Sequence, residues 1–121
     1  MRYCLKELFE EYRFERVEGR LAITLDIFRY DPSTRKFSAM LENSLHGFNL
    51  VNGSFDYGST AGSGLVMRYY LAGREYEYSG MIEKTKKDVV IRLDRGPDPV
   101  TLKAKAKNGK AREISSIAEL V

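Results

Sequence analysis

The chain has 121 residues, of which 43% are hydrophobic, 31% charged and 12% aromatic. This length and composition fit one globular domain with a packed core, and they exclude a two-domain enzyme. The 20 Lys and Arg residues outnumber the 17 Asp and Glu residues, giving a net charge of +3. Such a mild excess is compatible with an anionic partner but does not require one.

Membrane, disulfide and metal classes are not expected from the sequence. No window reaches the ~18 apolar residues of a membrane helix, and Glu7, Glu10 and Glu11 lie where a signal peptide would be apolar. We therefore expect a soluble, cytoplasmic protein without membrane insertion. Cys4 and His46 are the only cysteine and histidine, too few for an intrachain disulfide or a zinc cluster. A Cys4 nucleophile with His46 as base lacks any thiolate-stabilising context around Cys4.

The first expected element is an amphipathic helix over roughly residues 2–13. Leu5, Leu8, Phe9 and Tyr12 follow the i, i+3, i+4, i+7 spacing of one helical face. Past Arg16 the apolar period changes to two, which indicates strands. These expected strands cover residues 21–28, 37–41, 48–50, 65–71, 76–82, 89–93 and 100–106.

Turn signals separate these strands at residues 31–33, 42–47, 72–74 and 96–99. Short antiparallel strands at regular spacing, with no helices between them, favour an all-β fold and a closed or nearly closed barrel. We expect six or seven strands over residues 14–107. Ile114, Ile117, Ala118 and Val121 then predict a short C-terminal helix within a tail over 108–121.

Two short clusters stand out as candidates for ligand chemistry. Arg16 and Arg20 form an RxxxR spacing just before the first expected strand. Glu42, Ser44 and Gly47 form an ExSxxG spacing at the break between the next two strands. Each is weak when taken alone, because arginine pairs and Ser-Gly turns arise easily by chance.

Together and in this order, the two clusters resemble the cyclic di-GMP-binding PilZ domain. The similarity covers roughly residues 14–107, and from Gly62 onward it rests on the strand pattern alone. It implies a small split β-barrel and a single-domain receptor that binds cyclic di-GMP and passes the signal to a protein effector. It also implies no enzymatic activity, no metal and no cofactor. Motility and biofilm formation are outputs typical of the family.

The resemblance assigns Arg16 and Arg20 to phosphate and guanine recognition, and Glu42, Ser44 and Gly47 to the surface around a guanine. Arginine presents a planar fork to phosphate or to the guanine O6/N7 edge, and a carboxylate accepts from the guanine N–H groups. The family usually has Asp or Asn where this chain has Glu42, which puts affinity in doubt. Two further residues are possible contacts: Arg13, and Asn43, whose side chain should point away from that of Glu42.

Ligand binding is expected to order the segment from Arg16 to Arg20. This ordering could reposition the N-terminal helix; the alternative is a helix that packs permanently on the barrel.

Three other functions remain open. A ligand-independent adaptor of pilus or flagellar machinery is the nearest alternative. A nucleic-acid-binding barrel is supported by the basic face Lys103, Lys105 and Lys107 with Lys110 and Arg112, although we regard nucleic acid as an unlikely partner. A small lipid- or ligand-carrying barrel is permitted by the number of strands, but no motif supports it.

Overall fold

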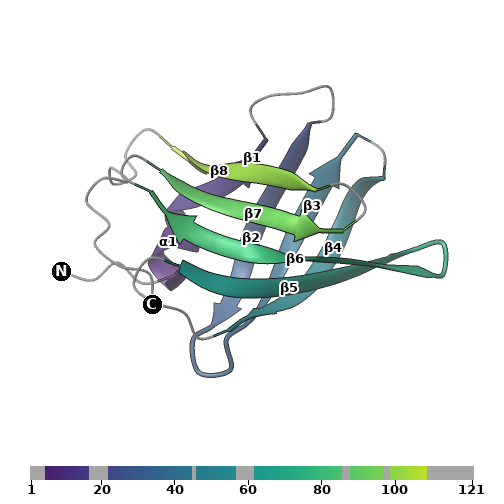
Figure 1. Ribbon diagram of the computed structural model, residues 1–121, viewed down its shortest axis with the longest axis horizontal. Helices are drawn as coiled ribbons and strands as arrows, with labels where there is room; N and C mark the ends of the chain where they lie inside the picture. The colour runs from purple at the N-terminus through teal and green to yellow at the C-terminus, as the bar shows by residue number, and fades with distance from the viewer. Residues whose placement is uncertain are drawn as a thin grey trace.

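A computed structural model describes residues 5–16, 22–44, 46–56, 62–85, 88–96 and 99–108 (Figure 1). These residues form one α-helix followed by eight β-strands. In chain order the elements are α1 (Leu5–Glu11), β1 (Tyr12–Glu15), β2 (Ile23–Asp31), β3 (Lys36–Asn43), β4 (Gly47–Phe55), β5 (Gly62–Leu71), β6 (Arg74–Lys84), β7 (Val89–Arg95) and β8 (Val100–Ala106).

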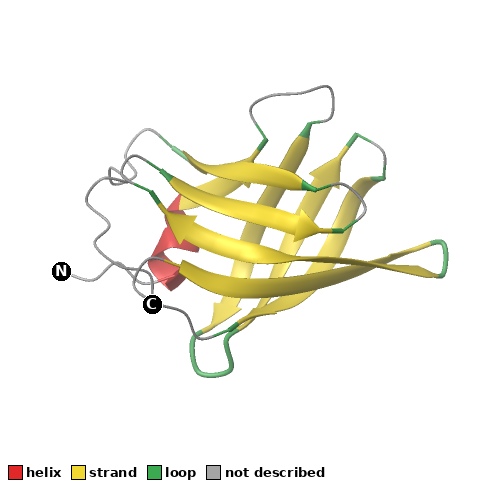
Figure 2. Ribbon diagram, in the orientation of Figure 1, coloured by secondary structure: helices red, strands yellow, loops and turns green. Residues whose placement is uncertain are grey.

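The strands form a closed antiparallel barrel in which every strand pairs with its neighbours in sequence (Figure 2). The last strand returns to the first, with Tyr12 opposite Ala106 and Glu15 opposite Lys103. The all-β antiparallel barrel expected from the sequence is confirmed. The expected number of six or seven strands is wrong, because the barrel has eight.

The additional strand is β1, which the helical pattern concealed. Tyr12 fits position i+7 of the helix, but α1 ends at Glu11 and Tyr12 begins β1. Within β1 the period is two: Tyr12 and Phe14 are buried, whereas Arg13 is exposed. A strand of four residues is too short to override a neighbouring helical pattern in sequence analysis. Arg13 therefore lies on a strand and not in the last turn of the helix.

Alternation along the strands decides which side chains fill the barrel. In β2, for example, Ile23, Leu25 and Ile27 are buried and the residues between them face outward. Inward side chains from the strands and from α1 form one apolar core. Its largest fully buried members are Tyr69, Phe14, Leu5, Leu8, Leu25, Ile27, Leu41, Met67, Ile82, Ile91, Leu93 and Leu102.

Helix α1 belongs to this core. Leu5, Leu8 and Phe9 are buried, and the Phe9 ring stacks on Phe55 with their centroids 5.5 Å apart. Lys107 secures the helix from outside, because its Nζ donates to the Phe9 carbonyl oxygen at 2.9 Å. The structure thus shows the helix packed against the barrel, which both expectations for the helix include.

Several expected turns are confirmed. Asp31 accepts hydrogen bonds from the Ser33 N–H at 2.9 Å and the Ser33 hydroxyl at 2.7 Å, which fixes the turn after β2. The β5–β6 hairpin turns through Ala72 and Gly73 with φ values of 52° and 78°. Two positive φ angles are typical of the type I′ turn that joins tightly paired strands.

Some expectations lie outside the described residues. They are the helical positions before Leu5, the start of the expected strand at Leu21, and the C-terminal helix beyond Asn108. Across the part of the chain that the structure describes, no helix is long and apolar enough to span a membrane.

Candidate functional site

The described residues of the two sequence clusters, and those next to them, lie at the barrel end opposite α1 (Figure 1). We call this end the far rim and define it as residues 16, 22–23, 43–44 and 46–47. The backbone N–H of Arg16 donates to the Ile23 carbonyl at 2.9 Å. The backbone N–H of Ala22 donates to Ser44 Oγ at 3.0 Å. Arg16 and Ala22 are therefore each held by a backbone hydrogen bond, and the acceptor for Ala22 is the serine of the second cluster.

The β3–β4 turn of the far rim is fixed by its own side chains. Asn43 Oδ1 accepts from the His46 backbone N–H at 2.6 Å, and Asn49 Nδ2 donates to the His46 carbonyl at 3.0 Å. Gly47 has a φ of +70°, and a Cβ added there would meet nothing within 4 Å. Glycine is thus favoured at position 47 because the turn requires a positive φ angle, and not because a side chain there would clash.

Glu42 and Arg13 lie on the outer face of the barrel. Glu42 is opposite Thr24 on β2 and Phe48 on β4, and its side chain is exposed whereas that of Asn43 is buried. The expected opposite orientation of these two side chains is confirmed. Arg13 Nε is paired with Glu15 Oε1 at 2.9 Å. The structure thus places Arg16, Ser44 and Gly47 at the far rim, with Ile23 of β2 between Arg16 and Asn43, and Glu42 beside the rim, while Arg20 lies outside the described residues.

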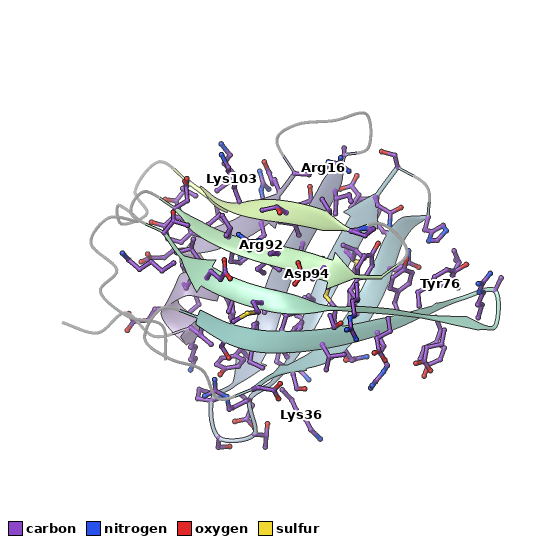
Figure 3. All side chains as sticks on the ribbon, in the orientation of Figure 1. Arg16, Lys36, Tyr76, Arg92, Asp94 and Lys103 are labelled. Carbon is purple, nitrogen blue, oxygen red and sulfur yellow. The ribbon has the colours of Figure 1, made fainter. Side chains whose placement is uncertain are left out.

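Arg16 also lines a surface groove of about 540 Å³ that extends onto β7 and β8. Its other lining residues are Arg92, Leu93, Asp94, Pro99, Val100, Thr101 and Lys103. Figure 3 shows Arg92 and Asp94 on β7, with Lys103 on neighbouring β8 and Arg16 near the end of β1. Sequence analysis missed Arg92 and Asp94 and took Lys103 for part of a basic face. The one sequence pattern that could have indicated them is the alternation of outward-facing Arg92 and Asp94 with buried Leu93.

The expected basic face of β8 is present in part. Lys103 and Lys105 are exposed on alternate positions. Lys107, by contrast, lies beyond the strand, where its Nζ donates to Phe9 and lies 3.0 Å from Asp26 Oδ1. Lys110 and Arg112 lie outside the described residues.

A polar and aromatic cluster closes the barrel beneath the far rim. His46 Nδ1 lies 3.0 Å from the Tyr69 hydroxyl, and the Tyr69 ring stacks on Tyr76 with centroids 5.2 Å apart. Burial raises the pKa of Tyr69 above its ordinary value, and a hydrogen bond with Asn43 partly offsets this. Through these contacts Tyr69 joins the β3–β4 turn to β5.

Among the described residues, no three His, Cys, Asp or Glu side chains form a group that could hold a metal ion. Comparisons with known proteins gave no match to a family model, a curated protein or a solved structure.

Proposed function

We propose that this chain is a receptor for cyclic di-GMP, which it binds at the far rim without turning it over. The hydrogen bond between Ala22 and Ser44 carries the proposal, because it joins a residue just after the RxxxR spacing to the serine of the ExSxxG spacing, which is distant in sequence. An anionic dinucleotide needs both features, guanidinium forks for its phosphates and acceptors for its bases.

The signal in this proposal is a change in order of residues 17–21. Arg16 and Ala22 mark the ends of this segment, and both are anchored through the backbone. Two phosphates held by Arg16 and Arg20 would restrict the segment between them, exposing a different rim surface to a protein effector. The proposal assigns no movement to helix α1, whose apolar face is buried in the core.

Isothermal titration calorimetry with cyclic di-GMP tests the proposal. We expect saturable binding in the micromolar range or tighter, and a loss of at least about tenfold in Arg16→Ala and in Arg20→Ala because each removes a charged donor. Arg29→Ala is the matched control, since Arg29 is exposed on β2 on the side of the barrel where α1 lies. GTP controls for any guanine nucleotide. Absence of heat with the wild-type chain would refute the proposal.

A ligand-independent adaptor is the second candidate function. The observation that favours it is a set of exposed apolar side chains on the outer face of β2, β3 and β4, namely Phe28, Met40, Phe48 and Leu50. Met40 and Leu50 are directly opposite each other. Exposed apolar clusters of this kind are typical of protein contacts. This function predicts a protein partner whose binding is reduced by Leu50→Asp and unchanged by Arg16→Ala, measured by quantitative pull-down without nucleotide.

A further inference from the structure

We propose that the groove on β7 and β8 is the second half of the ligand site. Arg92 and Lys103 would join Arg16 in holding the anionic part of the ligand, and Asp94 would accept hydrogen bonds from a base. This inference rests on the proposed function for the identity of the ligand. It adds Arg92 and Asp94, which no sequence pattern indicated, and gives Lys103 a role other than in a basic face for nucleic acid.

Strand register places the two cations within reach of one anion. Arg92 is directly opposite Thr101, and Lys103 follows Thr101 by two residues on the same outward face of β8. Such diagonal neighbours on adjacent strands are roughly 7–8 Å apart at Cα, a distance that long side chains can span. Asp94 follows Arg92 by two residues and faces the same way. The groove therefore presents donors and one acceptor on a single surface.

The charge of the groove suits an anion that has some hydrogen-bond donors. Three cations and one carboxylate line it. Arg92 Nη2 lies 3.3 Å from Glu83 Oε2, which leaves its other N–H donors available. Lys103 has no ion pair within the described residues. Cyclic di-GMP carries two phosphates together with guanine N–H donors, which Asp94 can accept.

A neighbouring residue offers a control for the groove. Leu93 and Val100 also line the groove, but their side chains are 1% and 8% exposed and belong to the core, so the outward-facing polar side chains must provide the binding contacts. Lys105, on the same strand and the same outward face, is not among the groove residues. It is therefore the matched control for Lys103.

The experiment compares Arg92→Gln, Lys103→Gln and Lys105→Gln by calorimetry with cyclic di-GMP, after circular dichroism and thermal unfolding confirm that each is folded. We expect about tenfold weaker binding in the first two variants and no change in the third, because only the first two remove a charged donor from the groove. Equal affinities in all three variants would overturn the groove and leave the proposed function standing.

Inorganic pyrophosphate separates the two proposals if the wild-type chain does not bind cyclic di-GMP. Amide shifts of groove residues in ¹H–¹⁵N spectra, weakened in Arg92→Gln and retained in Lys105→Gln, would support an anion groove although the proposed function had failed. No shifts with either compound would overturn both.

Asp94→Asn is expected to change the affinities for pyrophosphate and for cyclic di-GMP in opposite directions. Removing the carboxylate should strengthen pyrophosphate binding, because like charges repel, and weaken cyclic di-GMP binding, because an ionic acceptor is lost. A change in the same direction for both ligands would overturn the role assigned to Asp94.

Discussion

Replacing Phe9 with alanine should destabilise the barrel strongly, because this side chain closes the core at the α1 end. Phe9 is 3% exposed. Its ring contacts Phe14, Tyr30 and Phe55 at centroid distances of 6.2, 5.5 and 5.5 Å. Truncating a buried phenylalanine to alanine costs about 3–5 kcal/mol. Since a domain of this kind has a free energy of unfolding of about 5–15 kcal/mol, Phe9→Ala should remove a large part of it.

Urea unfolding followed by circular dichroism measures this loss. With a denaturant dependence of about 2 kcal/mol per molar, a loss of about 4 kcal/mol lowers the urea midpoint by about 2 M. Lys6→Ala, exposed on the same helix, is the control and should change stability by less than about 0.5 kcal/mol. A loss below about 1 kcal/mol for Phe9→Ala would refute the conclusion that α1 is held in the core. It would revive the hypothesis of a helix that moves on ligand binding.

Three further predictions concern the barrel and its far rim. Gly80→Ala places a Cβ 1.8 Å from the Arg92 carbonyl oxygen; we expect a loss of about 3 kcal/mol or more in thermal unfolding, and an unchanged midpoint would contradict the packing of β6 on β7. Because burial raises the folded-state pKa of Tyr69 above the ordinary 10.0, its contribution to stability is complete below pH 10.0 and is lost as pH rises toward the folded-state value. Tyr69→Phe should reduce this alkaline loss, and an identical pH profile would count against the assignment. Ser44→Ala removes the acceptor of the Ala22 N–H and should lower stability by about 1 kcal/mol and speed trypsin cleavage at the RxxxR segment, whereas unchanged digestion would show that this bond does not anchor it.

The barrel could be predicted from the sequence where apolar periodicity was long and uninterrupted. The alternation of Leu65, Met67 and Tyr69 persists through β5, and the end of that strand at Leu71 was predicted, although the strand begins at Gly62, before the expected start at Leu65. Strand β1 was missed because four residues following a helix contain only one repeat of the period. Its pairing with β8 is a contact between the two ends of the sequence, and no local pattern reports such a contact.

Of the candidate site, only the residues that belong to short sequence motifs could be predicted. Arg16 and Ser44 were singled out from spacing, and the structure places both at the far rim, where Ser44 accepts from the Ala22 N–H. Arg92 and Asp94 were not, because an outward-facing charge on a strand has the same pattern whether it is solvated or lines a groove. Only the closure of β8 on β1, which carries Arg16 toward β7 and β8, reveals the difference.

The pairing of β1 with β8 also governs how the chain can fold. Every other strand pair joins sequence neighbours and can form as an independent hairpin, so most of the barrel is built from contacts of low sequence separation. The final pair must instead bring together the first and last strands, at the entropic cost of closing nearly the whole described chain into one loop. Until this happens, β1 and β8 are exposed sheet edges that another unfinished copy could extend. Closure of the barrel should therefore be the slow step in folding, and the step most sensitive to protein concentration.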